Sequence, residues 1–525
     1  MKITNKYIFF ASAALMLASC ELDKFPEGQY VSGDQKEDII DQRPNLITAE
    51  VNAMAAKLNV FGTISDDANT YHNDYGVAAV SQFLEQGGQD MPCSTSGYNW
   101  FGTAQNYSDR LYTSVGDELI WKTFYNHLKA ANNVLTLTEG SEDEAMKRYR
   151  GQALAARAYD YLNLAQIYQF TYAGHEGDLC VPIVLETMTE EEMQTNPRAT
   201  VQQVYDQIMS DLNQAIELLT GFESGSKDQI DEAVAYGLRA RANLLMQKWA
   251  DAANDAQKAI AGGTPQTLEE VSTPTFNSAS ASSWLWGVLI TPDNDVVTTG
   301  IINWPSHLCS LTGNGYTTLT GTFRYVSSAL YDQIPDTDIR KQWFISPEGT
   351  STLVDNATVN GTPVIEYFGL TPYTNVKFGA YQDVMGNTTN SQDWPLMRVE
   401  EMYLIKAEGE AMSGNLPTAK QTLENFVKTY RNPSYVCNAS SAEAMQDEIW
   451  LQRRMELWGE GFALFDILRL KKPIIRKGTN YEAIVQFNID PESQIMIYRI
   501  PQCEMETNKG IKEEDNNPAA PQPTV

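Results

Sequence analysis

Apolar residues recur at three- and four-residue steps along much of this 525-residue chain, and no other feature limits its possible folds as strongly. Such spacing places the apolar side chains on one face of an α-helix. The clearest stretch is 117–138, where the apolar positions are Leu119, Ile120, Phe124, Leu128, Ala131 and Leu135. The pattern predicts further helices over 45–58, 142–170, 201–219, 231–247 and 250–261, and again within 391–470. We therefore expect a mainly α fold.

Two of the expected helix pairs have the residue spacing of tetratricopeptide units, in which small residues let two antiparallel helices cross closely. The matching residues are Tyr236, Ala240, Ala252 and Ala259 in the first pair, and Tyr403, Ala407 and Ala419 in the second. Tyr149, Ala153 and Ala165 match as well, although no turn interrupts that segment, so the spacing alone is weak support. The helix–turn–helix context is what favours a few units of this type.

Residues 271–390 differ from both flanks because they are rich in Ser, Thr, Asn, Gly and Tyr and lack strong helical periodicity. A stretch of this length is too long for a structureless loop in a compact domain, so we expect short strands and ordered loops laid over a helical frame. Trp284 and Trp286 lie in the apolar run "WLWGVLI", where core packing is favoured over ligand contact. The expected division is a leader over 1–19, a tether over 20–44, a helical region over 45–270, the loop-rich region over 271–390 and a second helical region over 391–525.

The N-terminus has the pattern of a secretory leader, with Lys2 and Lys6 ahead of an apolar run over 8–18. That run is shorter than the roughly 20 residues that a transmembrane helix needs. It ends at Leu17-Ala18-Ser19-Cys20, which resembles the lipobox of bacterial lipoproteins. The resemblance implies that Cys20 is diacylated on sulfur and becomes the first mature residue. The alternative is an uncleaved N-terminal helix with a chance cysteine.

Net charge limits the possible partners of the chain, and the number and spacing of its cysteines indicate their state. The formal net charge of −29 argues against nucleic acid or anionic lipid as partners, because like charges repel. Five cysteines follow Cys20, an odd number at wide spacing, with no C-x-x-C pair. We expect most of them to be buried free thiols.

No catalytic motif stands out. The four histidines are scattered, without the spacing of a metal site, and no G-x-S-x-G elbow occurs. Ser224-Gly225-Ser226-Lys227 is formally an S-x-x-K, but it lies in a polar connector without the partner motifs. Neighbouring carboxylates such as Glu400 and Glu401 are more often the solvated face of a helix than an acid–base pair. We expect no enzyme activity, no metal and no cofactor.

The irregular segments instead combine aromatic rings with amides. "GYNWFGTAQNY" places Tyr98, Asn99 and Trp100 close together, and Trp304 and Tyr316 recur in the central region. A flat aromatic ring can cover the apolar face of a sugar, while amides serve its hydroxyl groups. The alternative is that these rings fill the junction between loops and helices.

Several motifs together resemble the SusD/RagB family of outer-membrane nutrient-binding lipoproteins of Bacteroidota. They are "ELDKFPEG" after the lipobox, "RGQALAARAYDYLNLAQIYQ" followed by "DLCVPIV", "PLMRVEEMYLIKAEGEAMSGN", "EIWLQRRMELWGEGFALFDILRL" and "YRIPQCEMETNKGIKEEDNNP". The fourth is the most specific, although Gln452 replaces the expected glutamate and Ala463 the expected arginine.

The resemblance implies an α-helical fold with tetratricopeptide-type units framing a loop-rich, ligand-facing region. It implies capture of a glycan, or less commonly a peptide, by a lid over a SusC-like TonB-dependent outer-membrane barrel, with the lipoprotein anchored in the outer membrane and facing the cell exterior. The site carries over loosely: Asp74 of "HNDYG" would accept a sugar hydroxyl, Trp100 would stack, and Trp304 and Tyr316 would add further rings. A surface glycosidase and a purely structural surface component remain alternatives.

Overall fold

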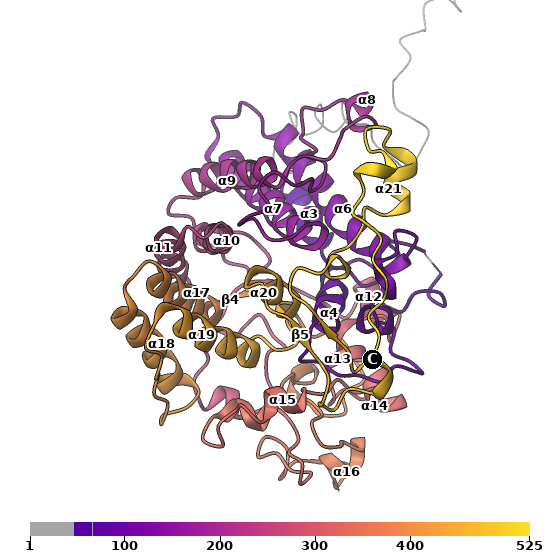
Figure 1. Ribbon diagram of the computed structural model, residues 1–525, viewed down its shortest axis with the longest axis vertical. Coiled ribbons are helices and arrows are strands. Elements are labelled where there is room, and N and C mark those ends of the chain that lie inside the picture. Colours follow the sequence, from indigo (N-terminus) through magenta and orange to yellow (C-terminus); the bar gives the residue numbers. More distant parts are fainter. Residues whose placement is uncertain (1–46, 66) are drawn as a thin grey trace, which may run out of the picture. The chain divides into compact units, whose positions relative to one another are not determined.

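Helices are the main regular structure of the computed structural model, which describes residues 47–65 and 67–525 (Figure 1). The chain divides into a unit of residues Met1–Ala49 and a unit of residues Glu50–Val525, and the architecture below is that of the second unit. The expected leader, Cys20 and the tether lie outside the described residues.

The longer helices are α3 (Ile47–Ala56), α4 (Val77–Gly87), α6 (Val115–Leu137), α7 (Glu144–Tyr168), α9 (Val201–Leu218), α10 (Glu232–Leu245), α11 (Trp249–Ile260), α17 (Val399–Met412), α18 (Leu416–Tyr430), α19 (Ala442–Glu456) and α20 (Ala463–Arg469). The short ones are α5 (Gly102–Gln105), α8 (Glu190–Met193), α12 (Asp295–Thr298), α13 (Trp304–Leu308), α14 (Tyr316–Thr320), α15 (Ser328–Tyr331), α16 (Val364–Phe368) and α21 (Gln502–Thr507). The strands are β1 (Trp284–Val288), β2 (Thr358–Val359), β3 (Thr362–Pro363), β4 (Trp394–Arg398), β5 (Ile474–Ile475) and β6 (Asn488–Ile489).

Side-chain caps fix where two of the predicted helices, over 142–170 and 201–219, begin. The Asp143 carboxylate accepts hydrogen bonds from the backbone N–H groups of Ala145 and Met146 at the start of α7. Thr200 and Gln203 form a reciprocal capping box at the start of α9. Both caps satisfy N–H groups that have no partner within the helix, so the sequence determines these helix starts locally.

Neighbouring helices pack in the order of the chain, α6 on α7, α7 on α9, α9 on α10, α10 on α11, and then α11 on α17 and α17 on α18 (Figure 1). The small residues of the predicted tetratricopeptide-type pairs are fully buried, namely Ala240, Ala252, Ala259, Ala407 and Ala419. At Gly409 an added Cβ would lie only 2.4 Å from the Trp249 carbonyl oxygen. The close approach of α17 to α11 therefore requires a residue without a side chain at this position.

The region 271–390 contains short helices, short strands and ordered loops, as the sequence predicts. Its strand β1 pairs antiparallel with β4, with Gly287 opposite Pro395. Trp284 and Trp286 are buried in β1, which confirms their predicted place in the core. The pairing ties the central region to the start of the C-terminal helices.

Two further sequence predictions can be compared with the described residues. Cys93, Cys180, Cys309 and Cys437 are buried free thiols, and Cys503 is a partly exposed one. Among the described helices, none combines the length and apolar character needed to cross a membrane.

A buried charge cluster lies where the central loops meet the C-terminal helices. Its cations are Arg340, Lys377, Arg398 and Arg431, and its carboxylates are Asp338, Glu400, Glu456 and Glu460. These positive and negative groups balance in number. Because ions buried in a protein must be paired to offset their desolvation, such a cluster fixes the segments that supply its members.

Glu456, at the end of α19, is the centre of this buried charge cluster. Its Oε1 accepts from Arg398 at 3.2 Å and from Arg431 at 2.8 Å, and its Oε2 accepts from Arg431 Nε at 2.8 Å. Arg340 Nη1 lies 3.5 Å from Oε2. Burial alone would raise the pKa of this carboxyl, but Arg431 and Arg398 hold it well below its usual range. Glu456 therefore stays ionised in the folded protein.

Replacing Glu456 with Gln should lower the free energy of unfolding by about 3–5 kcal/mol at neutral pH, because three guanidinium groups lose their shared counter-ion. Since the folded-state pKa is depressed, this contribution exists above the ordinary carboxyl pKa and disappears as the pH falls below it. Urea unfolding of both proteins from neutral to acidic pH would measure the difference.

Glu118→Gln is the matched control, since Glu118 pairs with Lys122 on the surface of α6 and should contribute about 1 kcal/mol or less. A loss at Glu456 no larger than at Glu118 would contradict the central role of the buried charge cluster.

Candidate functional site

Aromatic side chains from three separate segments meet at one place on the chain's loop-rich side. They come from the loop before α4, from the loop before α5, and from α13 and α14 of the central region. We call the six rings the aromatic column; its members are His72, Tyr75, Tyr98, Trp100, His307 and Tyr316.

Four of these rings form a stack that leads from solvent into the core. Tyr98 stacks on Tyr316 at 5.4 Å between centroids, and Tyr316 lies 5.0 Å from His307. His307 stacks in turn on Tyr75 at 5.4 Å. Exposure falls along this order, from 53% for Tyr98 to 6% for Tyr316 and 1% for Tyr75. Tyr98 is therefore the outer end of the column, with one ring face held by protein.

The other two rings form a side branch. The His72 ring stacks on Trp100 at 4.6 Å with an interplanar angle of 12°. His72 Nδ1 and the Tyr316 hydroxyl form a hydrogen bond that links this branch to the stack. Trp100 is partly exposed, and because His72 covers one of its faces, the ring can offer a ligand at most the other face.

Burial also sets the charge state of the column. Desolvation lowers the pKa of His72 and lowers that of His307 well below its ordinary value. Desolvation raises the pKa of Tyr316. His307 Nε2 donates to the His72 carbonyl oxygen at 2.8 Å, which fits a neutral imidazole. At neutral pH the column thus carries no charge and can act on a ligand only through ring faces and hydrogen bonds.

Amide side chains hold the loop that carries Tyr98. The Gln105 amide accepts from the Cys93 N–H at 3.2 Å and donates to the Cys93 carbonyl at 2.9 Å. Asn99 Nδ2 donates to Gln86 Oε1 at 2.9 Å and to the Ser94 carbonyl at 3.0 Å. These bonds close the loop at its base, so Tyr98 projects from a fixed frame.

The structure brings together three of the ring positions that the sequence suggests, Tyr98, Trp100 and Tyr316. Only Tyr98 is widely exposed, and Tyr316 acts mainly as the surface on which Tyr98 stacks. Asn99 lies beside them, but its amide nitrogen is already used by the loop. Whether these residues bind a ligand stays a prediction.

Two of the expected contacts need correction. Trp304 is 1% exposed, its Nε1 donates to the Gln392 carbonyl at 2.9 Å, and its ring packs on Trp394 in the core. Asp74 is fully buried, and its carboxylate accepts from the Ile64 N–H at 2.8 Å. Neither side chain faces solvent, so Trp304 is a core residue and Asp74 holds the preceding loop. An apolar ring or acid in a loop sequence does not by itself indicate exposure.

His72, Tyr75 and His307 are the members that sequence reasoning missed, and two of these three are histidines. A search for histidine in metal-site spacing passes over both, because here the imidazoles act as flat rings. The position of His72 within "HNDYG", two residues before Asp74, is the only local signal that it belongs to the same loop.

Two family models match the chain. Residues 34–244 match the one described as "Starch-binding associating with outer membrane", and residues 316–519 match the one described as "SusD family". The chain belongs to the SusD/RagB family. SusD-like proteins are binding proteins. No curated protein matches the sequence.

Solved structures agree with this membership of the SusD/RagB family. A SusD-like carbohydrate binding protein from Bacteroides vulgatus is 26% identical, with a TM-score of 0.73 over 90% of this chain and 97% of its own. A SusD superfamily protein from Bacteroides thetaiotaomicron is 22% identical, with a TM-score of 0.70 over 90% and 99%. A laminarin binding SusD-like protein is 18% identical, with a TM-score of 0.61 over 91% and 99%. The last two likenesses concern the fold alone.

Trp304 is buried and Tyr98 is exposed, so substitution should destabilise the protein strongly at Trp304 and only slightly at Tyr98. Trp304→Ala should cost about 3–5 kcal/mol of unfolding free energy, because it empties a buried ring position. Tyr98→Ala should cost about 1 kcal/mol or less, since only its stacking on Tyr316 is lost. Chemical denaturation of both variants provides the comparison, and equal losses would contradict the assignment of Trp304 to the core.

Proposed function

We propose that this protein binds glycans at the aromatic column and passes them to a partner TonB-dependent outer-membrane transporter. The observation that carries the proposal is the exposed Tyr98 ring, stacked on a buried aromatic support in a protein of the SusD/RagB family. The carbohydrate-binding relative from Bacteroides vulgatus and the laminarin-binding one support the ligand class.

The geometry suits a sugar for a physical reason. A pyranose has an apolar face of C–H groups that packs on a flat ring, and Tyr98 presents such a ring with its far face in contact with Tyr316. Burial of Tyr316 and His307 keeps this support from moving. A ligand that stacks on Tyr98 therefore meets a pre-organised surface, which limits the entropy lost on binding.

The proposed role needs no reaction at the site. The column is uncharged at neutral pH, and we assign its hydroxyl–imidazole bond, between Tyr316 and His72, the role of joining the side branch to the stack. We propose that the protein captures and delivers its ligand unchanged, with no cofactor. A peptide ligand, or slow cleavage of a glycan, would appear as alternative outcomes of the experiments below.

The proposal also includes a lipid anchor in the outer membrane and a SusC-like transporter as the partner. A lipid on Cys20 would hold the protein at the outer membrane, because each acyl CH₂ that enters the bilayer contributes about 0.8 kcal/mol. The acidic part of the chain that follows Cys20 would then face the cell exterior beside a SusC-like barrel. The sequence from Leu17 to Cys20 supports this anchoring.

Replacing Tyr98 with Ala should weaken glycan binding about tenfold or more, since an aromatic stacking contact and its buried area are lost together. Calorimetry with the glycan selected from an array of plant, host and microbial saccharides would measure it. Tyr367→Ala is the matched control, because Tyr367 is 44% exposed on α16, outside the aromatic column.

An unchanged affinity in Tyr98→Ala would refute the assigned surface. Binding of peptides with no binding of any saccharide would overturn the ligand class, and shortening of the glycan by the pure protein would favour an enzyme.

Replacing Cys20 with Ser should shift the protein from the membrane fraction to the soluble fraction, because serine presents no thiol for the lipid. Fractionation and mass spectrometry of the N-terminal peptide in native cells would follow the change. A wild-type peptide without lipid would contradict the proposed anchor.

A further inference from the structure

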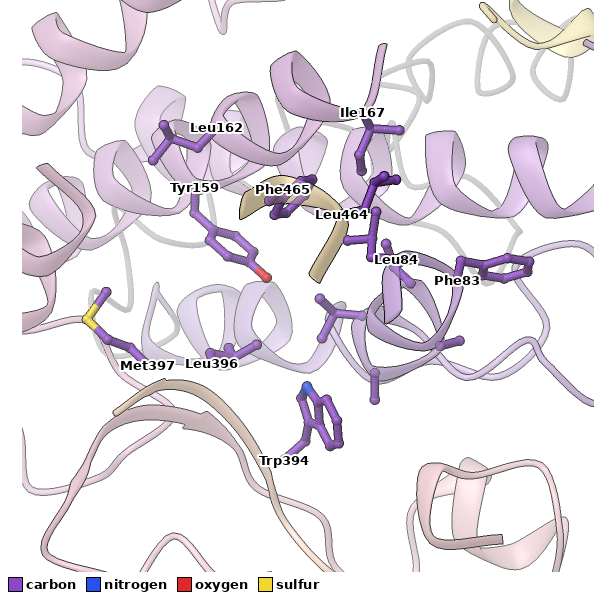
Figure 2. Close-up of a cluster of buried hydrophobic side chains, with 14 of the residues drawn as sticks. Phe83, Leu84, Tyr159, Leu162, Ile167, Trp394, Leu396, Met397, Leu464 and Phe465 are labelled. Atoms are coloured by element: carbon purple, nitrogen blue, oxygen red, sulfur yellow. The ribbon is translucent and has the colours of Figure 1, made fainter. Parts of the chain in front are cut away.

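A pocket that is separate from the aromatic column lies in the helical part of the protein, among α4, α7, α10, β4, α17 and α20. We call it the helical pocket. Its cavity volume is about 80 Å³, and no member of the aromatic column lines it. Figure 2 shows its walls, where Leu84, Leu162, Leu396 and Phe465 surround the space. Partly exposed Asn163 and Arg469 line it as well.

The carboxylates of this helical pocket are already saturated with donors. Both oxygens of Glu401 accept from Arg241, at 2.8 and 2.6 Å. Asp466 accepts from Arg453 through one oxygen and from Arg469 through the other, each at 2.7 Å. The remaining acid of the wall, Glu460, is held by Arg398 and Lys377 of the buried charge cluster. No carboxylate oxygen is left to hold a cation or an ammonium group.

Hydrogen-bond donors, by contrast, are left over. Arg453 is 4% exposed, and its Nη1 is buried without an acceptor among the described residues. Trp394 and Tyr159 line the same pocket, and Figure 2 shows the indole nitrogen and the hydroxyl turned toward the space. The Asn163 side chain is a hydrogen-bond neighbour of the Tyr159 hydroxyl. Burial raises the pKa of Tyr159, so its hydroxyl keeps its proton at neutral pH. Donors without acceptors in an apolar setting are costly, and a bound acceptor would relieve that cost.

We infer that this helical pocket is a second ligand site, which takes a small monocarboxylate with an apolar body. The carboxylate accepts from Arg453, Tyr159 and Trp394, and the aromatic or aliphatic body lies against Leu84, Leu396 and Phe465. A neutral or cationic molecule of the same shape fits less well, because the free groups are donors and one of them is a guanidinium.

The guanidinium groups of the wall are each paired with an acid, so the ligand meets no large excess of positive charge. Its binding depends on the unpartnered Arg453 Nη1 and on the donors of Tyr159 and Trp394, together with the apolar contact. We therefore expect affinity in the millimolar range or tighter, measurable by calorimetry with benzoate as the probe.

The test compares benzoate, benzyl alcohol and benzylamine on the full protein, and then repeats benzoate on Tyr159→Phe and Trp394→Phe. Benzoate should bind, and each variant should weaken it about tenfold, since each loses a hydrogen bond to a charged group. The matched controls are Tyr205→Phe and Trp284→Phe, because these side chains are buried, lack a polar partner and do not line the helical pocket. Both controls should bind benzoate as the wild type does.

Circular dichroism and thermal melting of every variant verify the fold. No binding of benzoate to the wild type, or equal binding of benzyl alcohol, would overturn the inference. Equal weakening in the control variants would do the same, because it would show a general loss of structure. Tyr98→Ala should leave benzoate binding unchanged, which separates this site from the proposed glycan surface.

Discussion

The buried charge cluster around Glu456 is the interaction on which the positions of the other segments depend. It takes Asp338, Arg340 and Lys377 from the central region, Arg398 from the end of β4 and Glu456 from α19. Such a cluster is weak support for stability in itself, because a well-packed apolar core can do as well. The cluster instead contributes to the specificity of the fold. Each buried charge needs an oppositely charged partner, so only one packing of the central loops on the helices leaves no charge of the cluster unpaired.

The helix that supplies Glu456 also positions the aromatic column. Arg454 pairs with Asp90 at 2.7 Å, and the Trp458 indole donates to the Asp90 carbonyl at 2.8 Å. Asp90 lies just before the loop that carries Tyr98, and its carbonyl also accepts from Ser327 of the central region at 3.0 Å. The end of α19 therefore holds both sides of the junction at which the column forms.

The sequence predicts the helical part well and the site only in part, and the difference has a physical cause. Periodicity and caps act within one segment, so α7 and α9 begin close to the predicted starts at 142 and 201. Burial of a loop residue depends on distant partners, which is why Trp304 and Asp74 could not be assigned from their neighbours. The same holds for His72, whose role depends on Trp100 and Tyr316, far away in the chain.

For the proposed glycan ligand, the aromatic column separates two contributions to binding: contact with the ring faces and discrimination by hydrogen bonds. The stack from Tyr98 to Tyr75 is uncharged, so under the proposed function it would contact the apolar face of a sugar and contribute little that distinguishes one sugar from another. Discrimination between ligands needs hydrogen bonds whose loss leaves a buried group unpaired. The column itself has few free groups of that kind, because Asn99 and Tyr316 are already bonded within the protein. If the proposed glycan site is correct, selectivity would come from polar residues beside Tyr98 in the chain, such as those at 94–97.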